Sequence, residues 1–178
     1  PILVKLMVDV MVATQININI REKASTFVVS LIVQKPGKIV LHKLVEPLLH
    51  CCFQLCVEPF EDSFEAGEMT PQKLAVEILD QLALNTPKDP LYTTAMGSVQ
   101  KLLDASRSEH ERKGGLVILA VIAEGLAEHL KGNLEQLLQV VCGSMGDQSS
   151  SVRTAAAVAI MQFADYLQPE VLDFHGIV

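Results

Sequence analysis

The stretch SVRTAAAVAIMQF, from Ser151 to Phe163, decides the fold class of this chain. One arginine, Arg153, is followed by small and apolar residues that carry no further charge. A helix on the surface of a globular protein keeps one polar face toward water. Because this segment is apolar on most sides, we predict a helix packed between several neighbours, with Arg153 in its first turn.

The composition of the 178 residues favours stacked helices. Hydrophobic residues make up 49% of the chain, but aromatic residues only 4% and Trp is absent, so the core must be aliphatic. Strands of a β-sandwich use more aromatic residues and Thr. The net charge of −7 argues against a direct nucleic-acid interface and favours a basic protein partner.

The cysteines and the first residues bear on the cellular compartment. Three of the four cysteines crowd into one apolar segment, which predicts reduced thiols in a cytosolic or nuclear protein rather than a disulfide framework. PILVKLMVDVMVA, residues 1–13, is too short to span a membrane and lacks the basic flank of a signal peptide. We expect an amphipathic helix with Lys5 and Asp9 one turn apart, in an excerpt from a longer protein.

Echoes of the opening stretch recur along the chain. With Arg153 as the anchor, the equivalent positions are Arg112, Gln72 and Arg21, which gives spacings of 41, 40 and 51 residues. Helix-pair repeats of the HEAT or armadillo kind have a period of about 40 residues. The spacing of 51 residues contains an insertion, which accounts for its length beyond the repeat period.

We therefore predict an all-α solenoid of HEAT repeats with about four antiparallel helix pairs and a partial fifth. The paired helices are expected at 2–14 and 20–34, 38–57 and 71–85, 90–105 and 109–128, and 130–145 and 149–167. The repeats of this single 1–178 domain are expected at about 1–35, 36–86, 87–128, 129–168 and, for the start of the next, 169–178. Pro47 lies inside the range 38–57, so a kink or break is expected near 44–46.

Charged residues at the helix starts predict a structural ladder. Arg153 follows Asp147 by six residues, so the two can pair across the turn and with equivalent residues of adjacent repeats. Arg112 and Arg21 are basic but have no acid six residues before them. The fourth position in the series, Gln72, is not basic. We predict an incomplete ladder that sets register more than stability, since exposed pairs contribute about 0–1 kcal/mol.

The segment ERKGGLVILAVIAEG, which begins at Glu111, and the residues that follow it to Glu170 resemble the central HEAT repeats of the importin-beta (karyopherin-beta) family of nuclear transport receptors. The likeness is strong from Thr70 to Glu170 and looser over 1–57. The resemblance implies a protein that shuttles between cytoplasm and nucleus and binds FG-repeat nucleoporins. It also implies basic protein cargo, such as core histones and ribosomal proteins, held on a concave face lined by second helices and released by Ran-GTP.

A HEAT-repeat scaffold subunit of another class, such as a phosphatase or chromatin-associated complex, is the alternative. A transport receptor and a scaffold of another class are distinguished by whether the parent chain begins with repeats that bind Ran-GTP.

The insertion EPFEDSFEAGE, from Glu58 to Glu68, holds five acids and no base. One interpretation is a solvated loop whose composition prevents packing. The other is a site that attracts basic cargo, with two phenylalanines adding apolar contact. For this interpretation the partner-binding residues are Glu58, Phe60, Glu61, Asp62, Phe64, Glu65 and Glu68.

HCCFQLC, from His50 to Cys56, raises the possibility of a zinc site, but no second cluster supplies further ligands. Cys51, Cys52 and Cys56 are therefore predicted to pack as small hydrophobic residues. The chain carries no HExxH, GxSxG, P-loop or GxGxxG motif. We predict a protein that is not an enzyme and uses no cofactor or metal.

Overall fold

The computed structural model describes residues 2–60, 68–174 and 176, and within these it contains ten α-helices, one 3-10 helix and no strand. None of these helices is long and apolar enough to cross a membrane. Their bounds are α1 Ile2–Val12, α2 Ile18–Gln34, α3 Pro36–Leu41, α4 Val45–Val57, α5 Pro71–Asn85, α6 Lys88–Leu102, α7 Glu109–Gly125, α8 Ala127–Lys131, α9 Leu134–Ser144, α10 Ser150–Tyr166 and η1 Glu170–Phe174.

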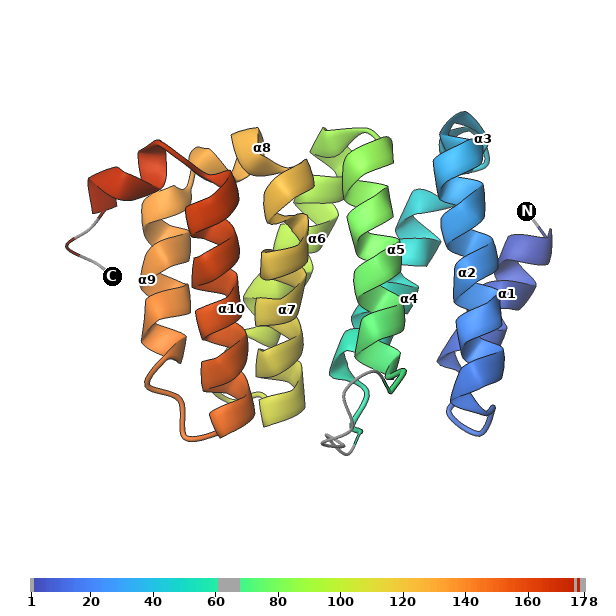
Figure 1. The fold of residues 1–178 in the computed structure, drawn as a ribbon, viewed down its shortest axis with the longest axis horizontal. Helices are drawn as coiled ribbons and strands as arrows, with labels where there is room; N and C mark the ends of the chain where they lie inside the picture. Colours follow the sequence, from blue (N-terminus) through green and yellow to red (C-terminus); the bar gives the residue numbers. More distant parts are fainter. Residues whose placement is uncertain (1, 61–67, 175, 177–178) are drawn as a thin grey trace.

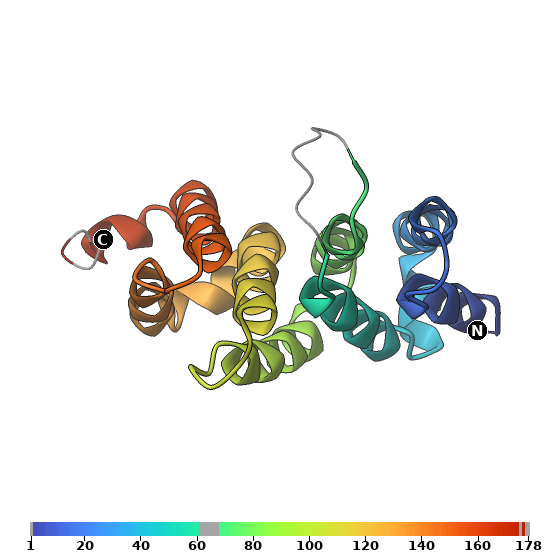
Figure 2. The same ribbon diagram turned by 90° about the horizontal axis from the view of Figure 1, so that it is seen from below.

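The long helices form two layers (Figures 1 and 2). The first helices of the pairs, α1, α4, α6 and α9, lie in one layer, and the second helices, α2, α5, α7 and α10, lie in the other. Figure 2 shows the layer of second helices on the inner side of a shallow curve. The predicted all-α solenoid of four helix pairs with the start of a fifth is confirmed.

Local sequence signals fix where the second helices begin. Ser108 accepts a hydrogen bond from the amide of Glu111, and the Glu111 side chain accepts one from the amide of Ser108, which completes a capping box before α7. Thr70 caps α5 in the same way by accepting from the amide of Lys73, and Pro71 occupies the first helical position.

Pro47 lies downstream of the break that it was expected to cause. The chain leaves the helix at residues 42–44, between α3 and α4, and Lys43 has a positive φ of 53° there. Leu44 is the N-cap of α4, so Pro47 falls in the first turn, where a missing amide hydrogen disrupts no intrahelical bond. The proline is accommodated by a helix that restarts just before it.

The apolar character of α7 follows from its position, whereas α10, predicted to have neighbours on most sides, packs mainly against α7 and α9 and leaves Val158 and Met161 exposed. α7 packs against α4, α5, α6 and α10, so little of its surface remains for water. Phe163 is among the largest fully buried side chains. The apolar pattern of 109–128 and 149–167 predicts eight core positions in these two helices, and all are buried except Ile160, which is half-buried against the core. They are Leu116, Leu119, Ala123, Val152, Ala156, Ala159, Ile160 and Phe163.

Two glycines let α7 approach its neighbours closely. A Cβ at Gly114, near the start of α7, would stand 3.0 Å from the carbonyl oxygen of Cys56 at the end of α4. A Cβ at Gly125, the last residue of α7, would stand 2.6 Å from the carbonyl oxygen of Ala83 in α5. The backbone of α7 therefore touches α4 at one end and α5 at the other.

Candidate functional site: a groove on the concave face

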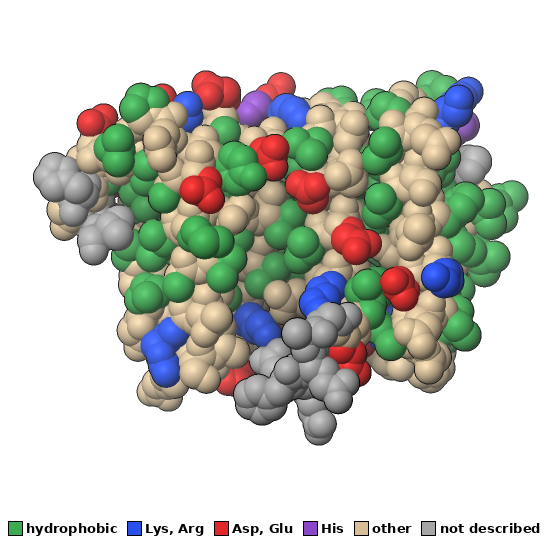
Figure 3. Space-filling model, viewed as in Figure 1, with side chains coloured by type: hydrophobic (Ala, Val, Ile, Leu, Met, Phe, Trp, Pro, Cys, Tyr) green, Lys and Arg blue, Asp and Glu red, His purple; other side chains and the backbone are tan. Residues whose placement is uncertain are grey.

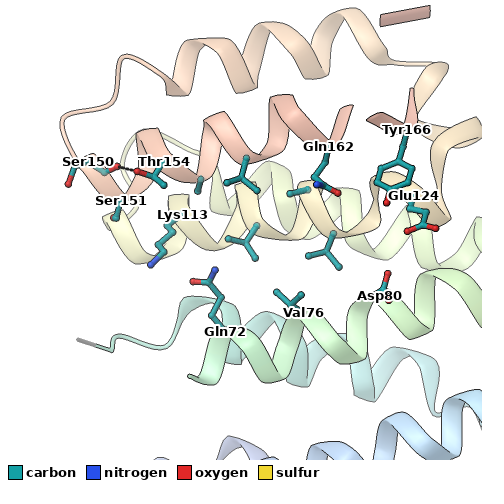
Figure 4. Close-up of a pocket in the computed structure, with 15 residues that line it drawn as sticks. Gln72, Val76, Asp80, Lys113, Glu124, Ser150, Ser151, Thr154, Gln162 and Tyr166 are labelled. Carbon is teal, nitrogen blue, oxygen red and sulfur yellow. Dashed lines mark hydrogen bonds between the residues drawn. The ribbon is translucent and has the colours of Figure 1, made fainter. Parts of the chain in front are cut away.

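A groove of about 700 Å³ runs between α5, α7 and α10 on the layer of second helices (Figures 3 and 4). Its floor is made of small aliphatic side chains, which leave room for a ligand while covering the core: Val76, Val117, Ala120, Val121, Ala155 and Val158. Polar and charged residues stand at the two ends of this floor, and they give each end a different chemistry.

The acidic end of the groove is formed by Asp80 of α5, Glu124 of α7 and Tyr166 of α10, which lie close together in Figure 4. Burial, and then the neighbouring Glu124 carboxylate, raises the pKa of Asp80 above its ordinary value. The Glu124 carboxylate also raises the pKa of the Tyr166 hydroxyl, with smaller contributions from burial, Asp165 and Asp80. A half-buried carboxyl group beside a second carboxylate favours a cation between the two.

The polar end of the groove is formed by Gln72, Lys113, Ser151 and Thr154 (Figure 4). The ammonium of Lys113 lies 4.7 Å from the ring centroid of Phe60, within the range of a cation–π contact. The side-chain oxygen of Gln72 is buried and has no hydrogen-bond partner among the described residues. This end therefore combines the Lys113 ammonium with a buried amide oxygen that could accept a hydrogen bond.

The ladder residues of the C-terminal half form a joint between adjacent helix pairs. The Arg112 guanidinium donates two hydrogen bonds to Asp147, at 2.7 and 2.8 Å, and the amide of Ser149 donates a third at 2.8 Å. These hydrogen bonds lower the pKa of Asp147 to about 2. Arg153 instead donates to the backbone carbonyl of Asp147 at 2.8 Å, so the acid pairs with the arginine of the preceding pair.

Arg21 forms a second joint, and its partner is Glu58 from the insertion. The guanidinium donates to both Glu58 carboxylate oxygens, at 2.8 and 2.5 Å, and its Nε donates to the carbonyl of Met11 at 2.6 Å. The side chains of Arg21 and Glu58 are only 4% and 16% exposed. Glu58, which we predicted as a cargo contact, thus lies within a structural joint.

The described residues at the two ends of the insertion contact α7 and α5. Phe60 contacts Lys113 at the polar end, and the backbone carbonyl of Glu68 accepts a hydrogen bond from the Lys73 ammonium at 2.5 Å. Four of the predicted contact residues lie outside the residues that the structure describes: Glu61, Asp62, Phe64 and Glu65.

The cysteine cluster lies on α4 and packs into the core, as its apolar surroundings predict. Cys51, Cys52 and Cys56 are all buried. Burial raises the pKa of the Cys51 and Cys56 thiols to about 12, and it raises the pKa of the Cys52 thiol well above its ordinary value. Metal ions bind the thiolate, so this environment disfavours metal binding.

The acidic end was not predicted, although the sequence contains a signal for it. Asp80, Glu124 and Asp165 are separated by 44 and 41 residues, close to the period of the helix pairs. Each stands near the C-terminal end of a second helix. Of these acids only Asp80 and Glu124 line the groove, and a search for acids that recur near the ends of second helices would have found them together with the exposed Asp165.

Comparison with known proteins finds relatives among nuclear import proteins. The chain is 35% identical over 156 residues to importin-4 of Mus musculus and 33% identical over 156 residues to importin-4 of Homo sapiens. Each match covers 79% of this chain and 14% of the relative. The chain therefore spans about one seventh of the length of these proteins.

Solved structures share the fold at lower sequence identity. Kap121p bound to Nup53p matches with a TM-score of 0.84 and 16% identity, over 98% of this chain and 18% of that one. Kap95p, whose binding acts on the switch loops of RanGDP, matches with a TM-score of 0.76 and 14% identity, over 94% of this chain and 21% of that one. A family model described as the Vacuolar 14 Fab1-binding region matches residues 110–178, which is less than half of the chain.

Proposed function

We propose, from the premise that this chain belongs to the importin-beta family, that its concave groove is a docking site for a basic segment of protein cargo. In this proposal the chain is a binding scaffold and not an enzyme. The whole protein would carry its cargo between cytoplasm and nucleus.

The acidic end of the groove is the observation that carries this proposal. Asp80 and Glu124 come from different repeats and meet at the end of an apolar floor, with the Tyr166 hydroxyl beside them. A lysine or arginine side chain has an apolar stem and a charged head, and so matches a floor of Val and Ala that ends in carboxylates. Binding of a cation there would offset the repulsion that helps to raise the pKa of Asp80.

The insertion gives basic cargo a second contact in this proposal. Its flanking residues reach the groove, since Phe60 contacts Lys113 at the polar end. Its acids, apart from the one held by Arg21, would raise the rate of encounter with basic segments in a salt-dependent way.

The test is peptide binding by fluorescence anisotropy at low ionic strength. We expect a lysine-containing peptide to bind the wild-type chain and to lose about tenfold in affinity for each of Asp80→Asn and Glu124→Gln, since a charged hydrogen bond contributes about 1.5–3 kcal/mol. Glu135→Gln, on the exposed face of the outer helix α9, is the matched control. Unchanged affinity in Asp80→Asn/Glu124→Gln would rule the acidic end out as the docking site.

FG-repeat nucleoporins and Ran-GTP are further partners in this proposal. A second hollow of about 340 Å³ lies between the outer helices α6 and α9, where Tyr92, Met96, Leu103 and Val140 offer apolar contact. Among the structural neighbours, Kap95p binds RanGDP. A pull-down of the full-length protein with Ran loaded with GTP or GDP tests this part, and equal recovery with both nucleotides would argue against nucleotide control.

A scaffold subunit of another class is the second candidate, and the match to the Vacuolar 14 Fab1-binding region over residues 110–178 favours it. The same pull-down separates the two candidates, because a scaffold of that kind has no reason to distinguish Ran-GTP from Ran-GDP.

A further inference from the structure

Basic side chains gather at one edge of the stack, over the short helix α3 and outside the groove. Figure 3 shows Lys and His side chains together at this edge, at the place where Figure 1 has α3. The sequence contains no acid over residues 23–45, so this part of a chain with a net charge of −7 is locally basic. The basic residues in and beside α3 are all exposed: Lys35, Lys38, His42 and Lys43.

The lysines of this cluster are not used within the described structure. No hydrogen bond or ion pair joins the ammonium groups of Lys35, Lys38 and Lys43 to another described residue. Exposed apolar side chains lie among them, since Leu41 is 68% exposed and Val40 is exposed as well. Lys38 and Leu41 are three residues apart in α3 and are therefore neighbours on the helix surface.

Lys43 has a backbone conformation that favours glycine. Its φ is 53°, and the amide of Leu44 donates to the carbonyl of Ile39 at 2.9 Å, which is the pattern that ends a helix through a left-handed residue. Glycine adopts this conformation without the steric cost that a Cβ carries. A lysine at this position is therefore unfavourable for the fold, and what it adds is an exposed ammonium group that glycine lacks.

We propose that Lys35, Lys38, Val40, Leu41 and Lys43 form a docking surface, the α3 surface, for an acidic segment of a partner protein. The carboxylates of that segment pair with the three lysines, and an apolar side chain of the segment contacts Leu41 and Val40. This partner is opposite in charge to the basic cargo proposed for the groove and binds at a different place. The α3 surface therefore does not depend on the proposed function.

The charges along the same edge favour a short protein segment over an anionic lipid surface. α8 lies at the same edge as α3 (Figure 1), and Glu128 of α8 and Asp89 of α6 are largely exposed there. A flat anionic membrane laid along this edge would meet these carboxylates as well as the lysines. An acidic segment of a few residues contacts the α3 surface alone.

The test measures the binding of three fluorescent peptides of equal length to the full chain by anisotropy at low ionic strength. The first peptide carries several glutamates and a pair of leucines, the second has glutamine in place of every glutamate, and the third has serine in place of both leucines. We expect the first peptide to bind, the second to show no binding, and the third to bind about threefold to tenfold more weakly than the first.

Paired variants locate the binding. Lys38→Gln/Lys43→Gln should weaken the first peptide about fivefold to tenfold. Lys23→Gln/Lys101→Gln makes the same change in net charge at exposed positions of α2 and α6, and should change the affinity by less than about twofold. Leu41→Gln should remove the difference between the first and third peptides.

Lys43→Gly separates the role of the side chain from that of the fold. It should weaken the first peptide and at the same time raise the melting temperature by about 2–4 °C, because it relieves the left-handed backbone. An equal loss of affinity in Lys38→Gln/Lys43→Gln and Lys23→Gln/Lys101→Gln would overturn the inference, because binding would then follow net charge alone. Binding to phosphatidylserine–phosphatidylcholine vesicles that Lys38→Gln/Lys43→Gln abolishes would overturn the assignment of a protein partner.

Discussion

Two ion pairs join successive helix pairs at the same edge of the stack, Arg21–Glu58 and Arg112–Asp147. In both, an arginine in the first turn of a second helix binds an acid that follows the first helix of the next pair. The arginine of the N-terminal joint is 4% exposed and that of the C-terminal joint 19%. Gln72, which the sequence spacing aligned with these arginines, is the second residue of α5, whereas Arg21 and Arg112 are the fourth residues of their helices, and the first turn of α5 holds no arginine.

The first turn of α5 also lies at one end of the groove. The joints hold the neighbouring pairs together at that edge, and at Gln72 the stack lacks an arginine to make this connection. The polar end of the groove lies there, with the Gln72 oxygen buried without a partner among the described residues. The first turn of α5 thus carries a buried amide oxygen without a described partner, where the first turns of α2 and α7 carry a paired guanidinium.

The largest effect is expected from breaking the more buried joint. Arg21→Met leaves Glu58 and the Met11 carbonyl without their donor in a nearly closed environment, and should lower the free energy of unfolding by about 3 kcal/mol. Chemical denaturation followed by circular dichroism measures this loss. Arg21→Met/Glu58→Leu should recover most of the stability, since replacing both charges removes the unpaired acid. A loss below about 1 kcal/mol in the single variant would show that the joint is only a surface contact.

Breaking the C-terminal joint should lower the free energy of unfolding by a smaller amount, and this amount should depend on pH. Asp147→Asn should cost about 2 kcal/mol at pH 7, because it weakens hydrogen bonds to a charged group. The folded pKa of about 2 lies below the ordinary value of 3.8, so the carboxylate stabilises the fold at neutral pH and this contribution is lost as the pH falls toward 2. Urea melts should therefore show a smaller difference between wild type and variant near pH 2 than near pH 7. A difference that stays constant would contradict the assignment, and Asp9→Asn serves as the exposed control.

The insertion contributes one of its acids, Glu58, to the N-terminal joint. Replacing Glu61, Asp62, Glu65 and Glu68 by Gln should weaken a basic peptide about tenfold at low ionic strength, at about 0.2–1 kcal/mol per contact, and leave stability unchanged. The loss should shrink at high salt. Glu58→Gln should do the reverse and lower stability with little change in affinity. Equal peptide affinity for the neutralised and wild-type insertions would reduce the insertion to a connection between α4 and α5.

The smallest effect is expected at the position that lacks a ladder arginine. Gln72→Met removes a buried oxygen without a described partner and should raise the free energy of unfolding by about 0.5–1 kcal/mol. Thermal melts compare it with Gln54→Met, at an exposed position of α4 where no gain is expected. Destabilisation by Gln72→Met would mean that the amide makes an essential contact.

The fold was largely predictable because it depends on periodicity, which a single sequence displays. Arg112 and Arg153 fixed the period, and the Pro and Gly residues between helices fixed their limits to within a few residues. The pairing of the ladder was less accessible, since Asp147 binds the arginine 35 residues before it in preference to the one six residues after it. The partner of Arg21 was concealed because the acid belongs to an insertion that interrupts the repeat.

The groove was not predictable from local motifs, because its residues come from three helices and only their packing brings them together. Asp80 and Glu124 look like ordinary surface acids when each is considered in its own helix. Their proximity depends on the register between α5 and α7, which buried side chains and the contact at Gly125 determine.

The two glycines of α7, Gly114 and Gly125, also determine how closely α7 packs against α4 and α5. The start of α7 contacts the end of α4 at Gly114, and the end of α7 contacts the end of α5 at Gly125. α7 therefore packs against both helices of the preceding pair. At Gly125 the backbone of α7 lies directly against the backbone of α5. A contact between two backbones adjusts less easily than a contact between side chains. A side chain larger than hydrogen at Gly114 or Gly125 would therefore force α7 away from α4 or α5 and change the shape of the groove.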